Sequence, residues 1–73
     1  KINNIREIIT KKNEVMAFIL GSDEYGLVDL TMFPKMYEKY KNISVNNIIK
    51  FYGVVERRYD RYQIIVNKLD ILE

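Results

Sequence analysis

The segment from Val15 to Pro34, VMAFILGSDEYGLVDLTMFP, carries the most information about the fold of this chain. It opens with a continuous apolar run to Leu20, which is the length of a buried strand. After a polar segment flanked by glycines, apolar residues alternate with Asp29 and Thr31. That alternation is typical of a strand with one face in the core and the other in water. The stretch therefore predicts two consecutive strands joined by a short turn.

Pro34 begins a different element, because proline is well suited to the first turn of a helix. Apolar side chains then recur at helical spacing, at Phe33, Met36, Tyr40 and Ile43. This spacing predicts one amphipathic helix of about three turns. The turn-forming segment 42–47 should end it.

Strands are also predicted on both sides of this central stretch. Residues 2–10 read as a strand with a bulge near Asn4 or Arg6, because the isoleucines do not alternate strictly. The polar segment 10–14 then forms a hairpin, in which Asn13 can adopt a left-handed conformation.

The C-terminal part predicts two more strands, at 48–57 and 62–69, with 71–72 continuing the second. They are joined by a hairpin at 58–61. Gly53 lies inside the first of them and predicts a bulge or a close approach of backbones.

The expected order is β-β-β-α-β-β in an all-β domain that covers residues 1–73. An open sheet would leave long unpaired edges, which proteins avoid. Closing the strands into a five-stranded barrel, with the helix plugging one end between the third and fourth strands, removes them. This is the arrangement of the OB fold. A chain that begins without Met in a strand is also expected to be a piece excised from a larger protein.

Composition excludes several classes of function. The 73 residues include 12 Lys and Arg and 10 Asp and Glu, but no His and no Cys. A structural zinc site and catalysis by thiols or histidines therefore lack their usual groups. Asp23, Glu24 and Asp29 are close in sequence, but Asp23 is better explained as the acceptor that fixes its own turn. We expect no catalytic residues, metal, cofactor, small-molecule substrate or membrane-spanning segment.

Several motifs in register carry a family resemblance. They are Thr10-Lys11-Lys12-Asn13, Met16-Ala17-Phe18, Asp23 with Gly26, Phe33-Pro34 with Tyr37 and Tyr40, and Gly53-Val54-Val55-Glu56-Arg57-Arg58. In this order and spacing the chain resembles the OB-fold domain of bacterial DNA polymerase III alpha subunits. Two positions depart from that family: Asn13 stands where glycine is common, and Gly21 where a large apolar residue is usual.

The resemblance implies a module that binds single-stranded DNA and positions the template strand in a replicative polymerase. The domain would do no chemistry, although its parent chain would be a DNA-directed DNA polymerase. Other domains of that polymerase, and replisome subunits, are the further expected partners. The implied location is the bacterial cytoplasm, at the nucleoid.

The expected binding surface is the face of the second and third strands, flanked by the loops that join strands one to two and four to five. From periodicity alone Phe18 reads as a core aromatic. The resemblance instead turns Met16, Phe18 and Leu20 outward, with Val15, Ala17 and Ile19 in the core. Two roles stay open for Tyr59 and Tyr62: they stack on bases, or they cover the mouth of the barrel. The candidate nucleic-acid-binding residues are Lys11, Lys12, Met16, Phe18, Asp29, Thr31, Arg57, Arg58 and Arg61.

Two alternatives stay open from the sequence. An outward Met16, Phe18 and Leu20 could be the core of a protein-docking surface, although that gives no reason for a basic rim. A tRNA anticodon-binding type of OB domain is the other, and competition between DNA and RNA oligomers would separate it from the DNA-binding hypothesis.

Overall fold

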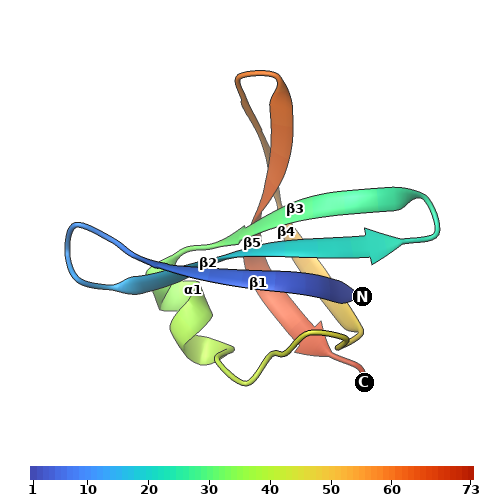
Figure 1. Ribbon diagram of the computed structural model, residues 1–73, viewed down its shortest axis with the longest axis horizontal. Coiled ribbons are helices and arrows are strands. Elements are labelled where there is room, and N and C mark those ends of the chain that lie inside the picture. The colour runs from blue at the N-terminus through green and yellow to red at the C-terminus, as the bar shows by residue number, and fades with distance from the viewer.

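The computed structural model describes residues 1–73 and contains five strands and one helix in the predicted order (Figure 1). The strands are β1 (Ile2–Ile9), β2 (Val15–Asp23), β3 (Gly26–Met32), β4 (Ile49–Arg58) and β5 (Arg61–Ile71), and the helix is α1 (Pro34–Lys39). No helix has the length and hydrophobicity needed to cross a bilayer.

All five strands form one sheet in the order β1-β2-β3-β5-β4. Neighbouring strands are antiparallel except β3 and β5, which run parallel and pair through Leu30 with Ile64 and Thr31 with Ile65. This order confirms the predicted OB arrangement.

The predicted closure of the barrel was wrong in detail, because β1 and β4 do not pair as strands. The Ile2 N–H donates to the Asn47 carbonyl over 2.9 Å, and the Asn46 N–H donates to the Ile2 carbonyl over 2.8 Å. The backbone N–H and carbonyl of Ile2 are thus hydrogen-bonded to the segment just before β4 and not to β4 itself. The two edge strands are connected at this corner only, and the sheet stays open beyond it.

Both predicted bulges are present. The β1–β2 register shifts between Ile2 and Asn4, and the β4–β5 register shifts between Tyr52 and Gly53. At Gly53 a side chain has no room, because a Cβ would clash with the Ile65 carbonyl oxygen and lie 2.6 Å from Cγ2 of Ile64. Glycine is therefore required here by the close approach of the neighbouring strand.

The β2–β3 and β4–β5 turns are shorter than expected but use the predicted residues. Strand β2 continues through Asp23, so only Glu24 and Tyr25 lie between β2 and β3. Asp23 Oδ1 accepts from the N–H of Tyr25 (2.7 Å) and of Gly26 (3.0 Å), which confirms its role as the turn acceptor. Asn13 has a φ of 63°, the left-handed conformation expected of it.

The helix begins at Pro34 as predicted but is half the expected length, with 6 residues. The Tyr40 N–H bonds to the Tyr37 carbonyl, and the Ile43 N–H to the Tyr40 carbonyl, so the chain continues as tight turns. Asn42 and Ser44 are poor helix formers, which explains the early end. The apolar residues keep a helical spacing beyond the end of the helix because Ile43, in the turns that follow, is also buried.

The core lies between the concave face of the sheet and α1. Tyr37 joins the helix to the sheet, because its hydroxyl donates to Glu7 Oε2 on β1 over 2.6 Å. The alternation of β3 is confirmed on this face, where Leu30 and Met32 are almost fully buried. The core side chains are Ile2, Ala17, Ile19, Leu30, Met32, Tyr37, Ile43, Val66 and Leu69.

Candidate nucleic-acid interface

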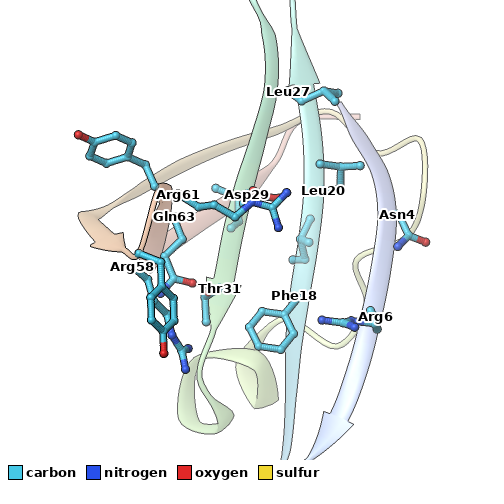
Figure 2. Close-up of a pocket in the computed structure, with 14 residues that line it drawn as sticks. Asn4, Arg6, Phe18, Leu20, Leu27, Asp29, Thr31, Arg58, Arg61 and Gln63 are labelled. Atoms are coloured by element: carbon cyan, nitrogen blue, oxygen red, sulfur yellow. Dashed lines mark hydrogen bonds between the residues drawn. The ribbon is translucent and has the colours of Figure 1, made fainter.

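A groove of about 600 Å³ crosses the outer face of β1, β2 and β3 and is bordered by the tip of the β4–β5 hairpin (Figure 2). Figure 1 shows why this border exists: the hairpin projects from the body of the sheet. Because β3 pairs in parallel with β5, the projecting arm rises beside β3. The lining residues are Asn4, Arg6, Phe18, Ile19, Leu20, Leu27, Asp29, Leu30, Thr31, Arg58, Tyr59, Arg61, Tyr62 and Gln63.

The floor of the groove is built around Phe18. Its side chain is half-buried, whereas its neighbours Ala17 and Ile19 are buried in the core. The outward orientation of Phe18 and Leu20 is therefore confirmed. The guanidinium carbon of Arg6 lies 5.1 Å from the centre of the Phe18 ring, a cation–π contact. Figure 2 shows the Arg6 side chain directed toward this ring.

Two arginines of the hairpin line the opposite side of the groove. Arg58 and Arg61 are cross-strand partners at the base of the turn. In Figure 2 Arg61 reaches across the groove toward Asp29 on β3. Cations on both sides of an aromatic floor are the arrangement that single-stranded nucleic acid requires, with phosphates at the edges and bases between them.

Two hairpin tyrosines also line the groove, Tyr59 and Tyr62. Tyr59 is 87% exposed and has a φ of 59°, a backbone conformation that is costly for a bulky side chain. Strain of this kind in an exposed turn points to a use for the side chain rather than to a packing requirement.

Thr31 does not face water as its alternation predicted; it is 3% exposed. Its hydroxyl donates to Gln63 Oε1 over 2.6 Å, and Gln63 Nε2 donates to Glu56 Oε1 over 3.3 Å. The Thr31 hydroxyl is covered because β5 lies beside β3. These hydrogen bonds connect the β4–β5 hairpin to the floor of the groove. Thr31 still lines the groove, but as a residue that positions Gln63.

Asp29 is exposed on the groove floor and lies directly across from Leu20 in the β2–β3 register. It is the one acidic residue among the lining side chains. A carboxylate accepts hydrogen bonds and donates none when ionised. It therefore adds to this basic groove a group suited to the amino and imino hydrogens of bases.

The expected exposure of Met16 was wrong, because Met16 is 7% exposed and does not line the groove. It lies directly opposite Ile8 on β1, at a separation where cross-strand side chains cover one another. Lys11 and Lys12 lie on the β1–β2 loop, also off the groove. Arg57 does not line the groove either, and its Nε donates to the Tyr59 carbonyl over 3.2 Å.

Two polar groove residues, Asn4 and Gln63, were absent from the sequence-based site, and Arg6 was weighed from the sequence only as a contact to the nucleic-acid backbone, with a surface charge as the default. Arg6 could be placed only with the β1–β2 register, which sets it directly across from Phe18. Gln63 could be placed in the groove only from the pairing of β3 with β5, which no local pattern in the sequence indicates. No group of three or more acidic side chains is placed where it could hold a metal ion.

Gly21 is buried, and a second concavity of about 380 Å³ opens beside it. Val28, Ile49 and Phe51 line this space.

The chain is similar to proteins called DNA polymerase III subunit alpha from Borreliella burgdorferi (32% identical over 99% of this chain), Staphylococcus epidermidis (31% over 94%) and Staphylococcus aureus (27% over 99%). It spans only 6% to 7% of the length of these relatives. No solved structure matches it. Residues 1–72 match the OB-fold nucleic acid binding domain family, to which this chain therefore belongs.

Proposed function

We propose that this chain is a module that binds single-stranded DNA within a bacterial DNA polymerase of the polymerase III alpha type. There it holds the template strand and carries out no chemistry itself. The observation that supports this most directly is the half-buried ring of Phe18 on the floor of a groove lined by Arg6, Arg58 and Arg61. Similarity to polymerase subunits over nearly the whole chain supports the choice of DNA.

Each part of a single strand has a counterpart in this groove. One base stacks on Phe18, which contributes about 1–3 kcal/mol and tolerates any base. The flanking phosphates contact the arginines of the rim. Because these contacts release condensed counterions, affinity falls steeply as salt is added.

The basic residues outside the groove take part when the strand is longer. Lys11 and Lys12 lie on the β1–β2 loop at one end of the sheet, and Arg57 lies on the hairpin arm. A strand that follows the groove and leaves it at the β1–β2 end would pass the two lysines. They contact phosphates of such a strand, and bases do not reach them.

The test is fluorescence anisotropy with labelled oligo-dT at several salt concentrations. We expect Phe18→Ala to weaken binding about 5- to 100-fold, the equivalent of one stacked base. Phe33→Ala is the matched control, because Phe33 is 49% exposed and lies off the groove. Circular dichroism should show that both variants fold. If the two variants bind equally well, or if the wild type does not bind at low salt, the proposed function is wrong.

A protein-docking function is the second candidate, because Leu27 is 71% exposed at the groove edge and lies near Leu20. Binding to a protein partner would depend weakly on salt and would not require Arg58 and Arg61. Parallel titrations with RNA of the same sequence test the preference for DNA, and tighter binding of RNA would contradict it.

A further inference from the structure

We propose that Asp29 makes the groove discriminate among bases, with guanine preferred and thymine disfavoured at the nucleotide that stacks on Phe18. This inference rests on the proposed binding of single strands and goes beyond it, because stacking alone tolerates every base. A groove that recognised only phosphates would gain nothing from an exposed carboxylate on its floor.

The β2–β3 register places Asp29 within reach of a base on Phe18. Phe18 pairs with Thr31, and Leu20 pairs with Asp29, so Asp29 is the diagonal neighbour of Phe18 on the same face. Diagonal neighbours in a sheet are close enough for long or aromatic groups to meet. A base is wider than the phenyl ring beneath it, so its edge extends toward Asp29.

Thr31 lies closer to the ring but is already engaged, because its hydroxyl donates to Gln63. Asp29 is exposed, so its oxygens are open to a ligand. In a single strand the Watson–Crick edge of each base is free to be read in this way.

The carboxylate distinguishes bases by their donors. Guanine presents N1–H and the N2 amino group side by side, which match the two carboxylate oxygens. Adenine and cytosine each offer one amino group next to a ring-nitrogen acceptor. Thymine offers only N3–H, between two carbonyl oxygens that the carboxylate repels. A two-point contact of this kind is strong because one partner is charged.

The surrounding arginines let phosphates pass beside Asp29. Arg61 extends toward Asp29 from the hairpin, and Arg6 and Arg58 also line the groove. Phosphates can therefore follow the arginines while the base edge meets the carboxylate. Arg61 compensates part of the negative charge on the floor.

The test uses labelled dT octamers that carry one central dG, dA, dC or inosine. With the wild-type chain we expect the dG oligomer to bind about tenfold more tightly than all-dT. Inosine lacks only the N2 amino group and should lose part of that gain. Asp29→Asn should reduce the preference to less than about threefold, because an amide has one oxygen acceptor and cannot accept both guanine hydrogens.

The control is Asp70→Asn, which removes the same charge from an exposed residue of β5 outside the groove. It should keep the wild-type preference. Circular dichroism verifies that both variants fold. If the four oligomers bind the wild type equally, or if Asp29→Asn keeps the full preference, the inference is wrong while the proposed function stands. If no oligomer binds at low salt, the proposed function fails and this inference fails with it.

Discussion

The guanidinium carbon of Arg6 lies 5.1 Å from the centre of the Phe18 ring, and the two residues are direct partners across β1 and β2. The cation therefore covers the surface on which a base would stack. We expect a base that stacks on Phe18 to displace Arg6 from the ring face, which would free the guanidinium to bind a phosphate of the same strand. The contact keeps an arginine next to the ring.

Replacing Arg6 should change the salt dependence of binding. We expect Arg6→Ala to weaken binding at low salt and to lower the slope of log affinity against log salt by about one. Arg6→Lys keeps the charge but not the planar group, so the slope should persist. Lys39→Ala on α1 is the control for a lost surface charge. A slope for Arg6→Ala equal to that of the wild type would exclude a phosphate contact.

The two basic clusters should differ in how they respond to oligomer length. Arg58 and Arg61 line the groove, whereas Lys11 and Lys12 lie off it. We expect the double variant R58A/R61A to weaken the binding of short and long oligomers alike. The variant K11A/K12A should weaken only long ones. Anisotropy titrations with dT oligomers of about 6 and 20 nucleotides, within the range of site sizes of OB domains and beyond it, measure this difference. Equal losses on the short oligomer would contradict it.

The left-handed backbone conformation of Tyr59 should lower the stability of the fold, and its exposed ring should contribute to binding. Its left-handed φ of 59° suits glycine better than tyrosine. We therefore expect Tyr59→Gly to raise the free energy of unfolding by up to about 1 kcal/mol in urea denaturation. The same variant should bind oligomers less tightly, because an exposed ring at the groove is lost. Tighter binding by Tyr59→Gly would show that the ring hinders the ligand.

Substitution by alanine should change the stability of the fold differently at the two glycines inside strands, Gly21 and Gly53. At Gly53 an added Cβ would clash with the backbone of Ile65, so Gly53→Ala should cost about 2 kcal/mol or more. At Gly21 it would lie 3.4 Å from the Lys1 carbonyl oxygen and from Val28 Cγ1, an ordinary contact. Gly21→Ala should be neutral, or stabilising by up to about 1 kcal/mol. Urea denaturation measures both, and an equal loss would contradict the assigned crowding.

The stability of the fold should fall at high pH through Tyr37. Burial, together with the hydrogen bond to Glu7 and the charge of that carboxylate, raises the pKa of Tyr37 from 10.0 to about 12. The unfolded chain therefore releases this proton near pH 10 while the folded chain keeps it. The contribution is fully present below pH 10 and is lost as pH rises to about 12, by an amount on the order of 2 kcal/mol.

The measurement is the free energy of unfolding between pH 9 and 12 for the wild type and Tyr37→Phe. The variant should lose about 1 kcal/mol below pH 10 with the hydrogen bond to Glu7, and should then fall less steeply above it. Tyr25→Phe, which removes an exposed phenol, is the control. Parallel pH curves for the wild type and Tyr37→Phe would show that Tyr37 does not cause the decline.

Local rules in the sequence determined the order of the elements and the positions of the breaks. Gly53 marked a bulge, Asp23 and Gly26 a tight turn, and Pro34 the start of the helix, as the structure confirms. These features depend on the conformational limits of a few neighbouring residues, so a short stretch of sequence is enough to predict them.

Which side chains meet depends on the tertiary structure. It buried Met16, covered Thr31 with Gln63, placed Arg6 on Phe18 and left Lys11 and Lys12 off the groove. The physical reason is that the exposure of a strand's outer face depends on what lies beside it. Here those neighbours belong to other strands, as with Gln63, which is 32 residues from Thr31 along the chain. The alternation of one strand carries no information about them.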